Sequence, residues 1–460
     1  MVRGTLDQMA CGGIRDHVGG GFHRYTVDAA WIVPHFEKML YDNAQLASLY
    51  LEAAAVFDSA TYRDVARETL SFLLREMVDV RGGVYASFDA DSGGEEGSYY
   101  VWTPSELRAL AGERDGKILA ALLGVTDAGN FDGKSVLTRH VSVRSVAEKF
   151  DLEPSEVERL LDAWKPAMIE ARAKRVRPGL DRKVVTAWTA LAISAFAEGY
   201  RLLGDARYLA AAQQASEFLW TAHRKPDGSL YRVSNGGEPS DEGILDDYGN
   251  FACALLDLYE ATGEVEHVRR AQQLVDLVLE VFTRDDGGFY MTRRGQDAPL
   301  GRRFDVFDDV EPSGNSSALH AAHRLSVITG MPKYRTCVDT SLRAIGGFAA
   351  RAGMELAWWL DVAQLLHGPA YVVVIAGDTG DALTAALERA IHGRLPPQAT
   401  LVRVPSGGPS AEQRSVIEVA RDATATGGRP TAYVCAPGAC QLPTTEAAEL
   451  VRQIMQGWTA

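Results

Sequence analysis

The sequence predicts a mainly α-helical protein, an (α/α)6 toroid of helical hairpins followed by a small α/β domain. Two observations lead to this fold class. Paired amphipathic helices recur along most of the chain, and alternating strands and helices follow them. Repeated helix pairs must stack on one another to bury their apolar faces. An open helical solenoid of the same hairpins explains the periodicity equally well.

The helix pairs are clearest in four segments. In each, an apolar helix ends near an aromatic residue or a glycine, and a short turn and a second amphipathic helix follow. Weaker helical patterns bring the count to about twelve helices, or six pairs. The four pairs span residues 46–77, 193–220, 253–282 and 318–348, and the weaker helices lie near 5–11, 105–123, 154–175 and 354–366.

Glycine and aromatic residues mark the turns after three of these pairs, at Gly82–Tyr85, Asp227–Tyr231 and Gly287–Tyr290. Glycine suits a left-handed turn, and the aromatic residue suits a short strand or a rim contact. Each turn leads through a loop into the next inner helix. In a closed ring, these loops open at one end, so that the polar residues at the helix starts converge on one pit.

Residues 17–46 form the most unusual stretch of the chain, with three histidines among aromatic and charged residues. We expect Pro34 to begin a helix, because proline is tolerated at the first helical position. Helical spacing would then place His35 and Asp42 on one face, and Glu37 and Tyr41 on another. Such a mixture is typical of a helix end that lines a pocket.

After His367 the pattern changes to three apolar strands that alternate with helices. This alternation predicts βαβ units and a small parallel sheet. The expected domains are therefore a toroid over 1–367, with an insertion at about 86–180, and an α/β domain over 368–460. The strands are expected at 371–376, 400–404 and 431–435, and the helices at 380–392, near 411–421 and from about 445.

Composition limits the classes of partner. The formal net charge of −14 argues against nucleic acid or anionic membrane, which both attract basic surfaces. No apolar run approaches the ~20 residues that a membrane span needs. Five scattered cysteines suit a reducing cytoplasm better than a disulfide framework. Cys435 and Cys440 could serve a metal or a disulfide, although buried or free thiols are the preferred interpretation, and no metal is expected.

The candidate catalytic groups are histidines and acids near helix starts. His35 and His23 could act as acid and base beside a sugar carbonyl, because imidazole titrates near neutrality. A bond to a backbone carbonyl explains either histidine equally well. Asp246, Asp247 and Glu311 could supply a carboxyl pair, which in an inverting glycosidase stands about 6.5 to 9.5 Å apart. A helix N-cap is the competing role for Asp246.

Further polar and aromatic residues are candidates for binding a substrate. Tryptophan and tyrosine rings suit stacking on a sugar, although most large aromatic residues in a helical barrel are core. Asp89 and Asp91 resemble a calcium loop in composition without its spacing, so a glycine-rich hairpin with solvated acids is favoured. The candidates are Arg24, Trp31, Glu37, Asp42, Asp89, Asp91, Trp188, Tyr248 and Asn315.

Several long motifs resemble the spermatogenesis-associated, thioredoxin-domain-containing family, and the resemblance covers nearly the whole chain. They are GGGFHRYTVDAAWIVPHFEKMLYDNAQL, GGVYASFDADSGGEEGSYYVWTPSEL, LDDYGNFACALLDLYEATG and EPSGNSSAL. The resemblance implies a six-hairpin toroid similar to N-acylglucosamine 2-epimerases and several glycoside hydrolases, with a small α/β tail. It also implies a preceding thioredoxin-like domain, which this sequence, without any C-x-x-C, is expected to lack. The first helix would then be exposed or paired with another subunit.

Two classes of function follow. The first is a carbohydrate-active enzyme, epimerase or isomerase more than hydrolase, because the histidines gather in the longest motif. The second is a non-catalytic scaffold that binds a ligand or a partner segment. The expected partner is a sugar-like small molecule, with a homo-oligomer as a further candidate and without nucleic acid, membrane or cofactor. The sugar connection rests on analogy of fold.

Overall fold

A computed structural model describes residues 1–367, 371–378, 380–391, 399–436 and 439–457. Residues 368–370 and 392, which the predicted domain and helix bounds include, lie outside the described residues. The chain divides into two compact units. Unit 1 comprises residues 1–50, 60–78 and 85–182, and unit 2 comprises residues 51–59, 79–84 and 183–460.

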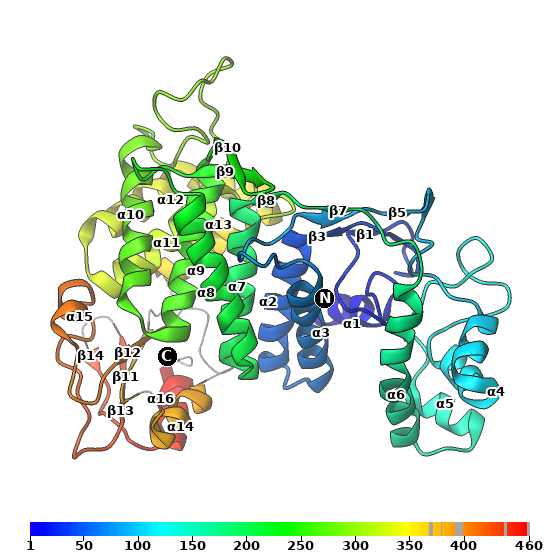
Figure 1. Cartoon of the computed structure of the whole chain (residues 1–460). Coiled ribbons are helices and arrows are strands. Elements are labelled where there is room, and N and C mark those ends of the chain that lie inside the picture. The colour runs from blue at the N-terminus through cyan, green and yellow to red at the C-terminus, as the bar shows by residue number, and fades with distance from the viewer. Residues whose placement is uncertain (368–370, 379, 392–398, 437–438, 458–460) are drawn as a thin grey trace. The chain divides into compact units, whose positions relative to one another are not determined.

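Helices dominate the described chain, so the predicted mainly α fold class with a small C-terminal sheet is confirmed (Figure 1). The four clearest pairs all form helices joined by short turns. They are α2 (Leu40–Val56) with α3 (Ala60–Glu76), α7 (Thr186–Leu203) with α8 (Ala206–Ala222), α9 (Leu245–Thr262) with α10 (Val265–Val281), and α11 (Gly314–Thr329) with α12 (Pro332–Ala352). Closure of the hairpins into a ring stays a prediction.

Helix α9 lies at the centre of unit 2, where it packs against both α7 and α11. Its apolar residues occupy all sides, as expected of a helix surrounded by others. Two glycines allow its first turns to approach α11. A Cβ at Gly249 would lie 2.3 Å from Ser317 Oγ, and one at Gly314 would lie 2.7 Å from the backbone nitrogen of Asp246. The starts of the two helices are therefore held together.

The ends of these inner helices follow ordinary capping chemistry. At the start of α11, the Ser313 hydroxyl accepts a hydrogen bond from the Ser316 N–H group. Gly204, Gly263 and Gly330 end α7, α9 and α11 in the left-handed conformation, with φ values of 74°, 76° and 65°. The glycines that end the apolar helices in the sequence are thus helix C-caps.

Unit 1 contains further helices besides α3. Three of the weaker patterns are confirmed, whereas the short α5 was not predicted. The helices are α1 (Val2–Cys11), α4 (Pro104–Leu122), α5 (Val143–Phe150) and α6 (Pro154–Ala173). Trp102, Leu107 and Ile118 belong to a buried cluster in the middle of the predicted insertion. The insertion therefore has an apolar core of its own.

Short strands join the helices. In unit 1, β1 (Tyr25–Thr26) pairs with β2 (Pro34–His35), and β4 (Ser87–Phe88) pairs with both β3 (Lys38–Met39) and β7 (Leu180–Asp181). The hairpin of β5 (Asp91–Ser92) and β6 (Glu95–Glu96) has the sharp glycine turn that was predicted. In unit 2, β9 (Tyr231–Asn235) pairs with β8 (Val184–Val185) and β10 (Glu238–Glu242).

The helix predicted to begin at Pro34 is wrong. Pro34 and His35 form an antiparallel strand, in which His35 is paired with Tyr25, and the helix begins only at Leu40. The proline φ that suits a first helical turn also suits extended backbone. Residues 34–35 and 38–39 pair with other strands, and the backbone groups of Phe36 between them bond to the side chains of Glu96 and His23. The predicted sharing of a helical face by His35 and Asp42 therefore does not occur.

The C-terminal strands lie where predicted, but the sheet is mixed. Strand β11 (Tyr371–Ala376) is parallel to β12 (Ala399–Val404) and antiparallel to β13 (Thr431–Ala436), so the prediction of a purely parallel sheet is wrong. The helices of this part of unit 2 are α14 (Ala382–Ile391), α15 (Ala411–Val416) and α16 (Ala447–Gly457), and helix α13 (Ala357–His367) precedes it.

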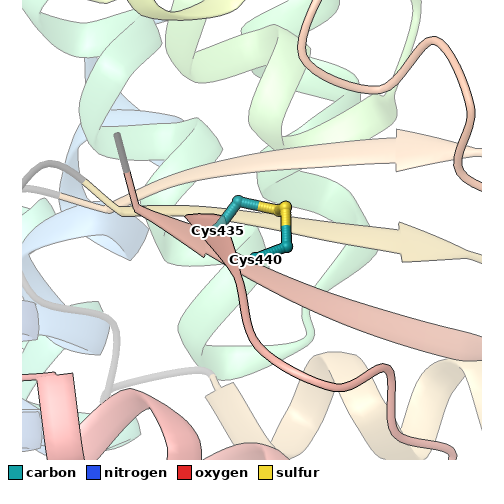
Figure 2. Close-up of a disulfide and its surroundings, with 2 residues drawn as sticks. All are labelled: Cys435 and Cys440. Atoms are coloured by element: carbon teal, nitrogen blue, oxygen red, sulfur yellow. A yellow bond between two sulfur atoms is a disulfide. The ribbon is translucent and has the colours of Figure 1, made fainter. Parts of the chain in front are cut away.

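Strand β13 also pairs with β14 (Ala439–Cys440), which brings two cysteines opposite each other. Cys435 and Cys440 form a disulfide with their Cα atoms 3.9 Å apart (Figure 2). The preference for free thiols at these two positions is therefore corrected, because the sequence could not show that the two residues face each other across a strand pair. Among the described residues, no helix combines the length and apolarity that a membrane span requires.

Candidate functional site

Three acidic side chains of unit 2 stand at the adjoining starts of α9 and α11. Asp246 and Asp247 lie in the first turn of α9, and Glu311 lies in the loop before α11. Glycines hold the two helix starts close together, as described above. The structure thus brings together three of the five predicted catalytic residues.

Asp247 has a structural role. Its Oδ1 accepts a hydrogen bond from the Ala187 N–H group at 3.1 Å, and its Oδ2 accepts one from the Ile244 N–H group at 2.9 Å. The predicted capping role at this helix start thus belongs to Asp247. Burial raises the pKa of Asp247 to about 7, against the opposing influence of Arg232, whose guanidinium lies 3.4 Å away.

Asp246 and Glu311 each keep one carboxyl oxygen without a protein partner. Oδ2 of Asp246 and Oε2 of Glu311 are buried and lack a hydrogen bond within the described part of the chain. Burial raises the pKa of both carboxyl groups, and the negative charge of Asp246 raises that of Glu311 further. The charge of one carboxylate thus disfavours ionisation of the other.

Trp188, in the first turn of α7, is hydrogen-bonded to one member of this carboxyl pair. Its indole Nε1 donates a hydrogen bond of 3.1 Å to Oε1 of Glu311, across 123 positions of sequence. This bond favours the ionised form and so lowers the pKa of Glu311. The half-buried indole ring therefore positions one oxygen of Glu311 and leaves the other unpartnered.

The two other predicted binding residues of unit 2 are core residues. The ring of Tyr248 is 1% exposed, and its hydroxyl accepts a hydrogen bond of 2.8 Å from the Leu230 N–H group. Asn315 is completely buried and bonds the backbone of Phe289 through both ends of its amide. Both side chains therefore fix the loops around the helix starts and have no surface to offer a ligand.

His35 lies in unit 1 between two carboxylates. Its Nδ1 is 2.8 Å from Oε1 of Glu96, and its Nε2 is 3.8 Å from Oε2 of Glu37. The Tyr25 ring stacks on the imidazole at a centroid distance of 5.0 Å, and Arg24 completes the row with a 3.0 Å bond to Glu37. The side chain of His35 keeps 29% exposure, so its imidazole can be reached by a ligand.

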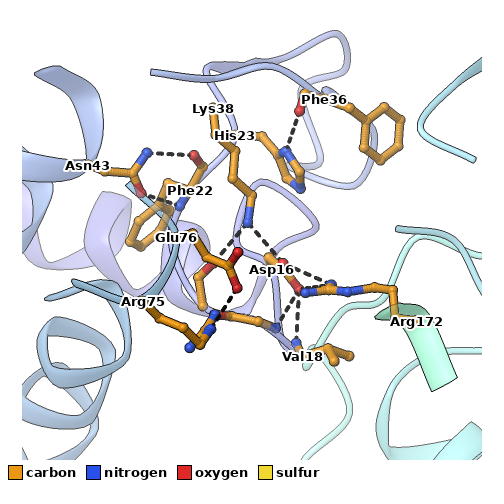
Figure 3. A network of polar contacts seen from close by, with 12 residues as sticks. Asp16, Val18, Phe22, His23, Phe36, Lys38, Asn43, Arg75, Glu76 and Arg172 are labelled. Carbon is orange, nitrogen blue, oxygen red and sulfur yellow. Dashed lines mark hydrogen bonds and ion pairs between the residues drawn. The ribbon is translucent and has the colours of Figure 1, made fainter. Parts of the chain in front are cut away.

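His23, by contrast, is a buried residue whose Nδ1 donates to the Phe36 carbonyl oxygen at 2.9 Å (Figure 3). The edges of Phe36 and Tyr100 enclose its ring. Burial, together with the charge of Lys38, lowers the pKa of His23 to about 3. The structure thus agrees with the alternative interpretation of His23, in which the histidine bonds to a backbone carbonyl group.

The remaining predicted binding residues occupy separate positions in unit 1. Trp31 is half-buried and has a positive φ of 63°. Asp42 lies in the first turn of α2, where burial of Tyr41 and then the charge of Asp42 raise the pKa of Tyr41. Asp89 and Asp91 are exposed, as solvated hairpin acids would be. Within the described residues, no group of three or more histidine, cysteine or acidic side chains is placed to hold a metal ion.

Sequence reasoning missed the partners of these residues. Glu96 was not among the candidate residues, although it contacts His35, 61 positions away. Arg232 was not singled out, although it lies beside Asp247. Nothing in the local sequence distinguishes either residue from a solvated surface charge, because these contacts depend on the pairing of distant segments.

Comparisons with known proteins identify relatives along the whole chain, although no family model matches it. Spermatogenesis-associated protein 20 of Homo sapiens is 33% identical over 491 residues, which cover 98% of this chain and 62% of the relative. The protein of the same name from Rattus norvegicus is 32% identical, and 99% of this chain and 62% of the relative are covered. This chain therefore spans less than two thirds of the length of these relatives.

Similar solved structures include two sugar epimerases. Cellobiose 2-epimerase from Spirochaeta thermophila is 14% identical with a TM-score of 0.46, and 75% of this chain and 70% of that chain are covered. A sugar epimerase from a ruminal bacterium is 15% identical with a TM-score of 0.43, and the covered shares are 72% and 66%.

Proposed function

The chain is homologous to spermatogenesis-associated protein 20 along 98% of its length, and we propose that its unit 2 carries an acid-base site for carbohydrates. The reacting groups of this site are the carboxyls of Asp246 and Glu311. Trp188 orients Glu311 and offers an indole ring near the carboxyl pair. The proposed reaction is proton transfer to and from a sugar, in a hydrolase or an epimerase.

One observation carries this proposal: two buried carboxyl oxygens, Asp246 Oδ2 and Glu311 Oε2, lack partners at adjoining helix starts. A buried polar atom without a hydrogen bond costs stability, on the order of 1–3 kcal/mol, and proteins keep such atoms mainly where function requires them. Neighbouring Asp247 and Asn315 have their hydrogen bonds completed by backbone groups. Thr189 Oγ1 and Asn250 Nδ2 on the neighbouring helices also lack partners, but neither group can exchange a proton near neutral pH as a carboxyl group can.

The raised pKa values suit the chemistry of a glycosidic bond. A carboxyl group with a raised pKa can donate its proton to a leaving oxygen, and an ionised carboxylate can accept a proton from water or substrate. The charge of Asp246 adds to the effect of burial on the pKa of Glu311, and a difference in pKa between the two carboxyls would let one act as acid and the other as base. An indole close to the pair matches the common use of aromatic rings against sugar faces.

A second candidate site for proton transfer is His35 in unit 1, which favours the epimerase or isomerase reaction. Its imidazole stands between Glu96 and Glu37 and remains partly exposed, as a base acting beside a sugar carbonyl must be. A non-catalytic scaffold that only binds a ligand is the alternative to both.

The test is a screen of reducing disaccharides, aryl glycosides and free sugars with the purified chain, followed by mutation. We expect Asp246→Asn and Glu311→Gln to lower kcat by about 10² to 10⁴-fold while the fold is retained. Trp188→Phe should move the limb of the pH profile that belongs to Glu311 to higher pH, because the bond that lowers its pKa is lost.

Asp286→Asn is the matched control, because Asp286 is a carboxylate of unit 2 with 71% exposure and a single surface partner, Arg284. Full activity in Asp246→Asn and Glu311→Gln would refute the carboxyl site. Loss of activity only in His35→Ala would indicate that the reacting group lies in unit 1. Sugar binding without turnover in any arm of the screen would establish the scaffold alternative.

A further inference from the structure

Unit 1 contains a half-open cavity of about 20 Å³ whose lining is rich in charge. The charged side chains are four cations and two carboxylates, an excess of two positive charges. They are Lys38, Arg75, Arg172, Arg177, Asp16 and Glu76, which come from the loop after α1, from β3, from α3 and from the end of α6 onward. Figure 3 labels all of them except Arg177. None of these residues belongs to the proposed carboxyl site of unit 2.

At the inner end of the cavity, one carboxylate compensates two buried cations. Both oxygens of Asp16 accept from Arg172, at 2.8 and 2.9 Å, and Oδ2 also accepts from Lys38 Nζ at 2.9 Å. Lys38 is 1% exposed, and burial lowers its pKa to about 8. Arg172 is 6% exposed, and its Nε atom has no hydrogen-bond partner in the described chain.

The outer end repeats this arrangement at the surface. Glu76 accepts from Arg75 Nε at 2.7 Å and is also paired with Arg177. Arg75 and Arg177 are 42% and 54% exposed, so both guanidiniums reach solvent at the mouth. Each carboxylate thus pairs with two cations, so the two carboxylates neutralise only two of the four positive charges in the lining.

Aromatic rings and a glycine shape the space around these charges. The guanidinium of Arg172 lies 4.9 Å from the Tyr99 ring centre, and Lys38 Nζ lies 4.4 Å from that of Phe72. A Cβ at Gly19 would meet Arg172 NH2 at 2.0 Å, so the glycine leaves room for the guanidinium. The aromatic rings beside the cations lower the local dielectric constant, which strengthens the attraction between these cations and an anion. A volume of this size holds little more than one water molecule, so it admits only oxygen atoms of an anion and not a whole sugar.

We propose that this cavity in unit 1 binds the anionic group, a phosphate or a carboxylate, of a small ligand. The excess of cations supplies the charge, and the guanidiniums supply paired N–H donors suited to such oxygens. The ligand's remaining atoms lie outside, beyond Arg75 and Arg177 at the mouth. The bound anion neutralises positive charge of the lining that Asp16 and Glu76 do not neutralise.

The test is calorimetric titration of the full chain at constant ionic strength. The probes are inorganic phosphate and glucuronate, with glucose as the uncharged control. The variant Arg177→Gln removes an exposed cation of the mouth. The matched control is Arg67→Gln, which removes an arginine of unit 1 that is 48% exposed and paired with Asp64 on the outer surface.

We expect saturable binding of at least one anion, no binding of glucose, and an affinity that falls about tenfold in Arg177→Gln but not in Arg67→Gln. Preference for phosphate or for glucuronate identifies the group. The proposal is overturned if neither anion binds, or if both variants behave alike, and Arg75→Gln provides an independent variant of the same mouth. Either result leaves the carboxyl site of unit 2 unaffected.

Discussion

Replacing Asp16 by asparagine should destabilise unit 1 more than any surface charge change. The side chain of Asp16 is 4% exposed and receives hydrogen bonds from Lys38, Arg172 and the N–H groups of Val18 and Gly19. Asparagine keeps one oxygen for the backbone groups but turns an amide toward two buried cations. Removal of one partner of a buried ion pair costs about 3–5 kcal/mol, and we expect a loss of this size.

The assay is urea unfolding together with hydrogen exchange of residues 12–22, because a chain with two units need not unfold in one step. Asp64→Asn is the control, since its pair with Arg67 is exposed and should contribute at most about 1 kcal/mol. Adding Lys38→Met to Asp16→Asn should recover part of the loss, because it removes an uncompensated buried charge.

The effect of Asp16 should also depend on pH in a defined direction. Burial alone would raise its pKa, but Arg172 and Lys38 hold the pKa of this carboxyl well below its usual range. A carboxyl with a lowered folded pKa contributes stability above the unfolded pKa of about 3.9, and this contribution disappears as the pH falls further. The gap between wild type and Asp16→Asn should therefore shrink below about pH 4. Equal stability of Asp16→Asn and Asp64→Asn at pH 7 would refute the reasoning.

Two further predictions concern the carboxyl pair and the thiols. Since burial raises the pKa of Asp246 and Glu311, their favourable contribution exists below the unfolded pKa of about 4 and disappears as the pH rises through the folded value. Asp246→Asn and Glu311→Gln should therefore melt no lower than wild type at pH 7, and lower melting of both variants there would contradict the assignment. Burial raises the pKa of Cys253 and Cys337 to about 12, so their reaction with Ellman's reagent at pH 8 should be slow in the native protein. After unfolding without reductant, three reactive thiols are expected, and five would contradict the disulfide of the C-terminal strand pair.

The sequence predicted the helices well because helix formation leaves a local periodic pattern. The three C-terminal strands lie within one residue of their predicted bounds, and the four clearest hairpins are present, although their first helices begin four to eight residues before the predicted starts. The start of α2 was missed, because Pro34 is compatible with both helix and strand and the deciding partner is Tyr25 in another segment. The antiparallel pairing of β13 with β11 was also missed, because the alternation of strands and helices along the chain does not specify the direction in which each strand runs.

The candidate acids were also found from local signals, as charged residues at helix starts and beside a proline. Their roles could not be separated in this way. Asp246 and Asp247 are neighbours in sequence, yet Asp247 accepts backbone hydrogen bonds at the helix start, whereas Asp246 keeps an unpartnered oxygen. Two adjacent residues of a helix point in different directions, and only the surrounding segments decide which of them is satisfied.

By itself, the sequence determined the helix-pair repeat, the change to strands and helices after His367, and the residue types available for acid-base chemistry. These features depend on the order of apolar and polar residues over a few helical turns. Tertiary structure alone decided that Trp188 holds Glu311, that Glu96 faces His35, and that Arg172 neutralises Asp16 from 156 positions away. The physical reason is that burial and charge pairing act through space, between segments whose contact no local pattern records.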